Sequence, residues 1–594
     1  MSQSVEKLVL LRAAMKQNGI NAYIIPLSDP HIGEYIPDFW NIIGWLTGFT
    51  GSAAIVIVTD SFAGLWTDSR YFIQAEQELA GSGFELVKPA GSVNSAFIDW
   101  LSTNLNDESR IALDGNIFPV DLARKMKEHL CGKKFLFDLN SDLISDIWSG
   151  RPVLPGSLVW DHLTGFSGKE RSRKISEVRD QMKKLGIDFH ILTSPDDIMW
   201  MLNIRGNDLP YSPLIFSFAI IGEEQILLFV GEDRFPHDLA TEFDRLGIIL
   251  LPYMETAGII STLTDGDTIL VSPSKTSVTL YNSIPERFRI IEDISIPSRL
   301  KAIKNKTEIE NIGKIMVLDG VALTKFFYWI ESDLGIVPMT ERSLVMRLHE
   351  FKIRLKDFLG PSFATIVAFN GHAALPHYSP TPDSDAELSE KGILLVDSGG
   401  QYPGGTTDIT RTVALGAPTP GQKKDFTLVL KGLIRLATAK FPYGTRGYQI
   451  DILAREALWD DGLNYGHGTG HGVGYCLNVH EGPQSISPSM NKTIIEPGML
   501  MSDEPAIYRE EQYGIRTENL IICYEDEETE FGRFLKFDTV SLCYIDKALI
   551  DKSLLNQKEI SWLNSYHSEV YDKLSPHLTD DEKIWLKEKT EAIF

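Results

Sequence analysis

The sequence predicts a multidomain α/β (α+β) protein, and three observations support this prediction. The chain has 594 residues, which is too long for a single hydrophobic core. Its composition, 43% apolar and 23% charged, is typical of globular proteins. Part of the N-terminal region recurs further along the chain, and helical and strand-like patterns alternate through most of the sequence. We therefore expect about three or four compact domains built from helices and strands.

An internal repeat defines the first two of these domains. Residues 11–29 resemble residues 178–196 at a constant offset of 167. In each copy an amphipathic helical segment ends at a glycine, and a short apolar run rich in β-forming residues follows. A Pro- and Gly-rich stretch at 149–157 indicates the end of the first copy. We expect one α/β domain over residues 1–155 and its repeat over residues 156–299.

A third domain is expected to begin near residue 300. Asn305 and Glu308 form the sequence pattern of a capping box, which precedes a long amphipathic helical segment. Helical and strand-like segments then alternate, so we expect this domain over residues 300–530. A C-terminal extension follows over residues 531–594. Its aromatic residues are expected to pack on the preceding domain or on a second subunit; they include Trp562, Tyr566 and Trp585.

Net charge and cysteine spacing argue against several classes of protein. The formal net charge is −24 and no basic stripe offsets it, so sequence-independent binding of nucleic acid is not expected. The four cysteines lack the C-x-x-C spacing of zinc knuckles and redox motifs, which fits a reducing compartment. Charges interrupt the apolar run at the N-terminus, and no apolar stretch approaches the roughly 18 residues that span a bilayer. We expect a cytoplasmic protein without membrane partners.

Two carboxylates lie on neighbouring strands of a predicted hairpin. An apolar strand-like run ends at Asp397, turn residues follow, and a second strand returns through Asp408. The hairpin would bring both carboxylates close together. Since like charges in a half-buried sheet repel each other, either one carboxyl takes up a proton or a cation lies between them.

Three further residues extend this acidic set. The stretch 466–474 has glycine at every second position, which disfavours a helix, lets the backbone approach a ligand and presents His471. Glu504 ends one strand-like run and Glu518 lies inside another, where a buried carboxylate without a partner would be costly. Four carboxylates and one imidazole form a mainly oxygen ligand set that suits Mn, Co or Mg ions. Two divalent ions would balance the four negative charges.

The order and spacing of these five residues resemble the ligand set of the pita-bread metallopeptidases, which include methionine aminopeptidase, prolidase and aminopeptidase P. Other segments resemble the three-domain cytosolic Xaa-Pro aminopeptidases along nearly the whole chain: EYIPDFW, GFTGSAAIVIVT, WTDSRYF, NIRGND, DSGGQYPGGTTDITRT, HGTGHGVG, NVHEGP, SDEPAIY, GIRTENL and WLNSYH. The resemblance implies two creatinase-like N-terminal domains, a pita-bread catalytic domain and a homodimer. Pro376 departs from the family, which has an aliphatic residue there, and leaves only the nearby backbone uncertain.

The resemblance also implies how the five residues hold metal. Asp408 and Glu518 would bridge two ions, and Asp397 would bind one of them. His471 and Glu504 would complete the other ion's ligands. Glu504 would in addition shuttle a proton during catalysis.

Three histidines match family residues that line the substrate site. His377 and His467 would hold the proline ring of the substrate, and His480 would donate a hydrogen bond to the developing oxyanion. The less favoured alternative for each of these histidines is an ordinary core or surface position. Arg70, in WTDSRYF, is a further candidate for substrate binding in the catalytic cleft.

We expect a metal-dependent aminopeptidase that hydrolyses the N-terminal Xaa-Pro bond of short peptides through a hydroxide bound to two metal ions. Each subunit would hold two divalent ions, with Mn²⁺ favoured and Co²⁺ or Zn²⁺ as alternatives. A protonated substrate amine suits a carboxylate-rich site, whereas the preference for proline rests on the resemblance alone. The alternatives are a prolidase or methionine aminopeptidase of the same fold, and a peptide-binding protein without catalytic activity.

Overall fold

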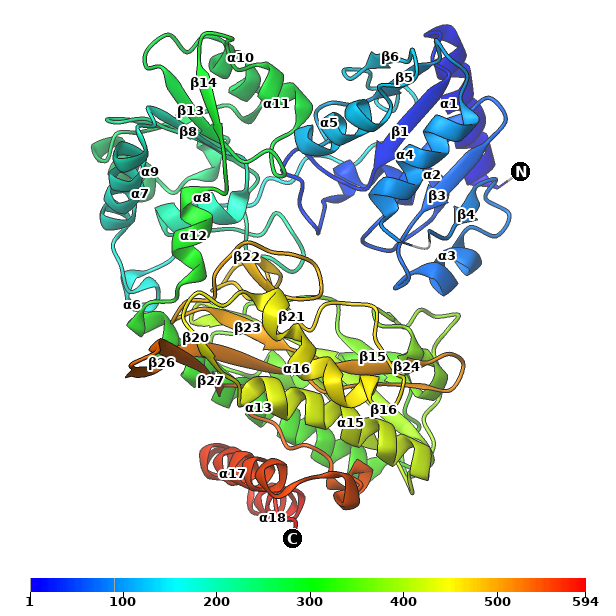
Figure 1. The fold of residues 1–594 in the computed structure, drawn as a ribbon, viewed down its shortest axis with the longest axis vertical. Coiled ribbons are helices and arrows are strands. Elements are labelled where there is room, and N and C mark those ends of the chain that lie inside the picture. The colour runs from blue at the N-terminus through cyan, green and yellow to red at the C-terminus, as the bar shows by residue number, and fades with distance from the viewer. Residues whose placement is uncertain (1, 90) are drawn as a thin grey trace. The chain divides into compact units, whose positions relative to one another are not determined.

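A computed structural model describes residues 2–89 and 91–594 of the chain, which form two compact units (Figure 1). The first unit comprises Met1–Asp161, Glu170–Leu209 and Leu214–Pro297. The second comprises His162–Lys169, Pro210–Pro213 and Ser298–Phe594.

The first unit contains two six-stranded sheets. The strands of the first sheet are β1 (Ala22–Pro26), β2 (Ile55–Thr59), β3 (Ala63–Trp66), β4 (Glu85–Val87), β5 (Arg110–Leu113) and β6 (Leu136–Asp138). Those of the second sheet are β8 (Phe189–Leu192), β10 (Phe218–Ile221), β11 (Ile226–Phe229), β12 (Ile248–Leu251), β13 (Thr268–Val271) and β14 (Arg289–Glu292). Two short strands, β7 (Trp160–Asp161) and β9 (Ile204–Arg205), pair separately.

The two sheets have the same topology. Their strand orders are β4-β3-β2-β1-β5-β6 and β12-β11-β10-β8-β13-β14. In the first sheet β1 is antiparallel to β2 and parallel to β5, and in the second β8 is antiparallel to β10 and parallel to β13. The repeat in the sequence is therefore a structural duplication, and the α/β fold class with two related N-terminal sheets is confirmed.

Helices cover both faces of the first sheet because its strands are apolar on both sides. Tyr23 and Ile25 pack with α1 (Gln3–Gln17) and α2 (Ile42–Thr47), whereas Ala22 and Ile24 pack with α4 (Val93–Asn104) and α5 (Val120–His129). The remaining helices of this unit are α3 (Phe72–Glu78), α7 (Arg171–Leu185), α8 (Pro195–Leu202), α9 (His237–Arg245), α10 (Thr256–Ser261) and α11 (Val278–Asn282).

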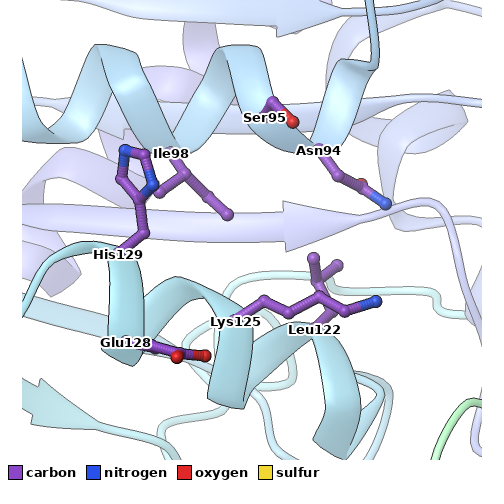
Figure 2. A pocket seen from close by; sticks show the side chains of 7 residues that line it. All are labelled: Asn94, Ser95, Ile98, Leu122, Lys125, Glu128 and His129. Carbon is purple, nitrogen blue, oxygen red and sulfur yellow. The ribbon is translucent and has the colours of Figure 1, made fainter.

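A pocket of about 470 Å³ lies between α4 and α5 (Figure 2). It is lined by Asn94, Ser95, Ile98, Leu122, Lys125, Glu128 and His129. The Nε2 atom of His129 lies 2.8 Å from Asp99 Oδ1, and both side chains are more than half exposed. None of the residues predicted for catalysis or metal binding lines this pocket, so it is separate from the predicted chemistry.

The second unit combines antiparallel sheets with long helices. Its strands are β15 (Ile366–Phe369), β16 (Ile393–Ser398), β17 (Gln401–Tyr402), β18 (Gly405–Thr406), β19 (Ile409–Ala414), β20 (Lys440–Pro442), β21 (Gly470–Gly472), β22 (Glu481–Ile486), β23 (Leu500–Asp503), β24 (Ala506–Arg509), β25 (Tyr513–Arg516), β26 (Asn519–Thr529) and β27 (Gly532–Thr539). Its helices are α6 (Thr164–Ser167), α13 (Lys306–Asp333), α14 (Glu341–Lys352), α15 (Pro420–Ala437), α16 (Gly447–Trp459), α17 (Gln557–Leu574) and α18 (Asp580–Lys589). The chain enters this unit through α12 (Ile296–Ala302).

Two sheets of this unit carry the predicted site. The sheet β15-β16-β19 and the sheet β20-β27-β26-β23-β21-β22 each contribute strands to it. Both pack with α13 to α16 around apolar cores. The predicted capping box is present, since the Asn305 side chain accepts from the Glu308 backbone and the Glu308 side chain accepts from the Asn305 backbone.

The C-terminal extension packs on the core of the second unit. Tyr566 and Trp585 are buried in the same apolar cluster as residues of α13 and β16, and Trp562 packs against this cluster. These aromatic residues therefore pack on the preceding domain, which is the first of the two arrangements expected from the sequence. The described part of the chain contains no helix long and apolar enough to span a bilayer.

A buried histidine of the extension makes the stability of this unit depend on pH. The Nε2 atom of His567 accepts a hydrogen bond from the Ile545 N–H at 3.0 Å, so the ring must be neutral at that atom. Burial lowers the pKa of His567 to about 3, whereas an unfolded histidine titrates near 6.5. Between these values the unfolded chain takes up a proton that the folded chain does not, so stability falls as the pH falls.

We expect His567 to cost about 2 kcal/mol of stability between pH 6 and pH 4.5. Glutamine at this position can still accept from the Ile545 N–H, so His567→Gln should lose less stability over the same interval. Urea unfolding at both pH values, followed by tryptophan fluorescence, measures the difference. His577→Gln, at an exposed position of the same extension, is the control. Equal acid sensitivity of the His567→Gln variant and the wild type would contradict this account.

Candidate metal centre

The predicted hairpin is formed by β16 and β19. These strands are antiparallel, with Asp397 opposite Thr410 and Ser398 opposite Ile409. Asp397 is the penultimate residue of β16. The prediction that the second strand runs through Asp408 is wrong, because Thr407 and Asp408 lie between the short strand β18 and β19. Both carboxylates are buried, with 8% and 4% of the residue surface exposed. The pair therefore lies where repulsion between the two charges is poorly screened by water.

The other three residues come from the larger sheet and its connections. His471 is the central residue of β21, and Glu504 directly follows β23. The prediction that Glu518 lies inside a strand is wrong, because Glu518 lies in a two-residue break between β25 and β26. The break has a topological cause: β25 pairs with β24 in a separate ribbon, whereas β26 joins the larger sheet. Glu518 occupies the crossing between them.

The five residues come together in space. One donor atom each of Asp408, His471 and Glu518 lie within 4.8 Å of one another. The Nε2 atom of His471 is 3.5 Å from Asp408 Oδ2 and 3.5 Å from Glu504 Oε1. Asp397 is close enough to raise the pKa of Glu518 through electrostatic repulsion.

The cluster is electrostatically unfavourable without cations. Burial raises the pKa of Glu518 well above its usual range, and repulsion from the three other carboxylates raises it further. Burial also raises the pKa of Asp397; Arg516 opposes this shift, and Asp408 adds to it. Asp397 Oδ1 is buried and has no hydrogen-bond partner among the described residues. The donor set and this unpartnered oxygen fit a site for hard divalent cations.

Arg516 belongs to the site, although we did not predict it from the sequence. Its Nη2 atom donates to Asp397 Oδ2 at 2.6 Å and its Nη1 atom donates to the Tyr508 hydroxyl at 2.7 Å. Nε donates to Thr410 Oγ1 at 3.1 Å, and this hydroxyl donates to Glu518 Oε2 at 2.7 Å. Arg516 and Glu518 are two residues apart, and in an extended segment residues at this spacing point to the same face. This spacing was the signal in the sequence that could have indicated Arg516.

The structure places two of the predicted histidines beside the metal-site residues. The ring of His480 meets that of His471 edge to face, with centroids 4.3 Å apart. The Nε2 atom of His467 is 2.9 Å from the Tyr508 hydroxyl, and Nδ1 is 4.0 Å from Glu504 Oε2.

His377 directly follows Pro376, whose carbonyl accepts from Arg516 at 3.4 Å. The backbone of Pro376, the residue that differs from the family pattern, therefore contacts the site. His467 and His480 thus adjoin residues of the cluster, and His377 follows a residue whose carbonyl contacts Arg516.

The glycines around His471 have a role that differs from the predicted one. A Cβ atom on Gly470 would lie 2.0 Å from the Ser502 carbonyl oxygen, and one on Gly472 would lie 2.1 Å from the Glu481 carbonyl oxygen. The missing side chains therefore allow neighbouring strands to approach β21, and this close packing fixes His471. The sequence pattern was correct in excluding a helix, but the close approach is between backbones.

Arg70 lies in the first unit. Its guanidinium donates to both carboxylate oxygens of Asp68, at 2.8 Å each. About 30% of each side chain is exposed. A role of Arg70 in substrate binding remains a prediction.

Sequence profiles of known families match almost the whole chain. Two versions of the Creatinase/Prolidase N-terminal domain match residues 7–140 and 150–308. Metallopeptidase family M24 matches residues 310–525, and the C-terminal region of peptidase M24 matches residues 533–593. The predicted creatinase-like domains, pita-bread domain and C-terminal extension are thus confirmed as the fold class.

Relatives that match along nearly their full length are named as Xaa-Pro aminopeptidases or aminopeptidase P. The chain is 36% identical to Aminopeptidase P2 of Arabidopsis thaliana, over 98% of this chain and 88% of the relative. It is also 36% identical to Xaa-Pro aminopeptidase 2 of Sus scrofa, over 99% of this chain and 89% of the relative. A solved structure, the X-prolyl aminopeptidase of Caenorhabditis elegans, is 33% identical with a TM-score of 0.94 over 100% of both chains. That protein is described as a cytosolic enzyme with a di-nuclear active site. The chain therefore belongs to the Xaa-Pro aminopeptidases of metallopeptidase family M24.

Proposed function

We propose that this protein is a metal-dependent aminopeptidase that removes the N-terminal residue from short peptides with proline at the second position. One observation carries the proposal: five potential metal ligands converge in a buried cluster whose carboxylates repel one another. Divalent cations would relieve this repulsion while all four carboxylates stay charged. The family gives the substrate class, since its members are named for the Xaa-Pro bond.

The charge of the site suits two divalent ions. Four carboxylates carry four negative charges, and Arg516, which hydrogen-bonds to Asp397, carries one positive charge. Two divalent ions then leave one net positive charge, so the centre still attracts one anionic oxygen atom. The oxygen-rich ligand set favours Mn²⁺, with Co²⁺ or Zn²⁺ as alternatives.

We assign the two bridging positions to Asp408 and Glu518. One donor atom of each of these carboxylates lies within 4.8 Å of the other and of a His471 ring nitrogen, which supports this assignment. Asp397 would bind one ion. His471 and Glu504 would bind the other, since His471 Nε2 and Glu504 Oε1 are 3.5 Å apart.

The bound ions would lower the pKa of a water molecule towards neutrality and thus supply the nucleophile. Glu504 is only partly buried, and its Oε1 atom accepts from Ser502 Oγ at 3.2 Å, which orients the carboxylate. It is our candidate for carrying the proton from the nucleophile to the leaving proline nitrogen. His480 would donate to the oxyanion that develops on the scissile carbonyl, and its ring contact with His471 supports this assignment.

His467 has a defined tautomer in this arrangement. Its Nδ1 atom lies 2.8 Å from the Gly468 carbonyl, so Nδ1 carries the proton and Nε2 accepts from Tyr508. Burial lowers the pKa of His467, which favours this neutral ring. A neutral imidazole face suits the apolar proline ring of the substrate, and we assign His467 together with His377 to hold that ring.

The same site explains removal of a single terminal residue. A free α-amino group is cationic near neutral pH, whereas an internal peptide nitrogen carries no charge. Once the anionic nucleophile has balanced the single positive charge of the centre, a carboxylate oxygen of the site can accept a hydrogen bond from this terminal group without net repulsion. We propose that the domains over residues 1–155 and 156–299 restrict access to short peptides and that Arg70 contributes to substrate binding. The catalytic domain would span residues 300–530 and the extension residues 531–594.

Substrate selectivity tests the proposed function. We expect protein stripped with a chelator to be inactive and to regain hydrolysis of Arg-Pro-Pro on titration with Mn²⁺, releasing free arginine. Xaa-Pro dipeptides and Met-Ala-Ser should be poor substrates, because the first lacks a residue after proline and the second lacks proline. Parallel titrations with Co²⁺ and Zn²⁺ identify the most effective ion.

The alternative functions predict other results. Preferential cleavage of dipeptides would indicate a prolidase, and cleavage of Met-Ala-Ser would indicate a methionine aminopeptidase. Binding of peptides without turnover would indicate a non-catalytic protein.

We further propose a cytoplasmic homodimer without membrane or nucleic-acid partners. The cytosolic description of the C. elegans relative supports the location. The net charge of −24 opposes binding to phosphate backbones. Light scattering of the purified protein tests the dimer.

A further inference from the structure

A buried arginine links the C-terminal extension to the metal centre. Arg411 lies in β19, three residues after Asp408, and only 2% of its surface is exposed. Its Nη1 atom donates to the carbonyl oxygens of Glu518 and Thr410, at 2.7 and 2.9 Å. Nε donates to the Tyr544 carbonyl at 2.9 Å. The guanidinium thus holds the backbone of a metal-site residue from one side and the start of the C-terminal extension from the other.

The second terminal nitrogen of Arg411 reaches the extension directly. Nη2 lies 2.8 Å from Asn519 Oδ1, 2.9 Å from the Cys543 carbonyl and 2.8 Å from the Tyr566 hydroxyl. All these acceptors are neutral. A buried cation stabilised only by neutral oxygen atoms depends on each of them, because no water can replace a lost partner.

Tyr566 projects from α17 into this network. Its hydroxyl donates to the Ser541 carbonyl at 3.0 Å and accepts from the Cys543 N–H at 3.3 Å as well as from Arg411. Its ring stacks on Trp562 of the same helix, with an angle of 3° between the planes. Ring packing and hydroxyl bonding can therefore be separated by a substitution that removes only the hydroxyl.

Glu518 depends on these contacts because no strand pairing holds it. It lies in the break between β25 and β26. Its N–H donates to the Thr410 carbonyl at 3.1 Å, its carbonyl accepts from Arg411, and its carboxylate accepts from the Thr410 hydroxyl. Movement of Arg411 would therefore shift the Glu518 backbone and with it the carboxylate.

We propose that Tyr566 and Arg411 are positioning residues for Glu518, so that the C-terminal extension is a functional part of the metal centre. The inference rests on the proposed metal-dependent function. A bridging carboxylate must reach two ions at once, so a small displacement of its backbone weakens the second ion more than the first. Tyr566 fixes the position of Arg411, and Arg411 fixes the position of Glu518.

Tyr566→Phe tests this role, with Tyr571→Phe on the same helix as the matched control. The Tyr571 side chain packs on the apolar cluster of the second unit, and we place it outside the metal centre. We expect Tyr566→Phe to bind the more weakly held Mn²⁺ about tenfold less tightly and to lower kcat about tenfold, with KM nearly unchanged. Calorimetric titration of the metal-free proteins with Mn²⁺ measures affinity and stoichiometry independently of activity. The control should match the wild type in both.

Thermal unfolding of the metal-free proteins separates positioning from general stability. We expect the Tyr566→Phe variant to unfold within a few degrees of the wild type, because the ring packing is retained. Wild-type affinity for both ions in Tyr566→Phe would overturn the positioning role, as would an equal effect of Tyr571→Phe. Failure of the wild type itself to bind two ions would overturn the proposed function instead, so the two failures are distinguishable.

Discussion

Replacing Asp408 by asparagine is expected to remove the tightly bound metal and to lower kcat/KM by at least about three orders of magnitude. The carboxylate lies 3.5 Å from His471 Nε2 and within 4.8 Å of a Glu518 oxygen, at the centre of the proposed ligand set. Asparagine has nearly the same shape, but it offers one neutral oxygen in place of two charged ones. It therefore cannot bridge two cations, and one of the charges that attract them is lost.

Elemental analysis after dialysis, together with Arg-Pro-Pro hydrolysis over a range of Mn²⁺ concentrations, measures both effects. Asp29→Asn is the matched control. Asp29 is also buried, but it lies in the first unit, and its Oδ1 atom accepts from the backbone N–H groups of both His31 and Gly33. The single amide oxygen of asparagine can still accept both, so this variant should keep its metal and its activity. Full turnover by Asp408→Asn would refute the bridging role.

The sequence predicted those parts of the structure that depend on short segments. The capping box at Asn305 and Glu308 involves residues three apart, and the hairpin of β16 and β19 joins neighbouring strands. The duplication was visible because two copies of a helix followed by a strand kept similar residues at a constant spacing. The capping box and the hairpin depend on interactions between residues that are close in sequence. The duplication was visible because the same pattern of residues occurs twice.

The errors concern residues whose surroundings come from distant segments. Residues 514–522, which include Glu518, were predicted as one strand. In the structure this segment is divided between a separate ribbon and the larger sheet. The glycines flanking His471 are explained by the carbonyl oxygens of Ser502 and Glu481, which no pattern within the glycine-rich stretch indicates. Local periodicity cannot reveal which sheet a strand joins or which backbone approaches a glycine.

Arg516 shows how tertiary packing completes a site. From the sequence we counted four carboxylates and balanced them with two divalent ions. The structure adds a guanidinium that donates to Asp397, so the balance changes by one unit and leaves attraction for an anion. Only 4% of the Arg516 side chain is exposed, so its charge acts on the site with little screening by water. The sequence therefore correctly predicted that the ligand set is negatively charged, but the predicted net charge lacked the contribution of Arg516.

Arg516→Gln is expected to weaken Mn²⁺ binding and to lower kcat/KM by about two to three orders of magnitude. Arg516 holds the Asp397 carboxylate in place and lowers its pKa, so its loss favours a protonated, displaced carboxyl group that binds metal poorly. The guanidinium also contacts residues that adjoin three other residues of the site. It contacts Tyr508, which hydrogen-bonds to His467, and Thr410, which hydrogen-bonds to Glu518. It also contacts the Pro376 carbonyl, next to His377. Glutamine is too short to replace these contacts together, so both metal affinity and the placement of the substrate histidines should suffer.

Arg509→Gln provides a matched comparison. Arg509 also pairs with a buried aspartate through two hydrogen bonds, to Asp425, but this pair lies outside the cluster of five ligands. If loss of any buried Arg–Asp pair impairs the enzyme through stability alone, both variants should lose activity in proportion to their unfolding temperatures. If Arg516 acts on the metal centre, Arg516→Gln should lose Mn²⁺ affinity in calorimetric titration while Arg509→Gln keeps it. Retention of wild-type Mn²⁺ affinity by Arg516→Gln would mean that Asp397 needs no cationic partner, and the charge balance proposed for the site would then be wrong.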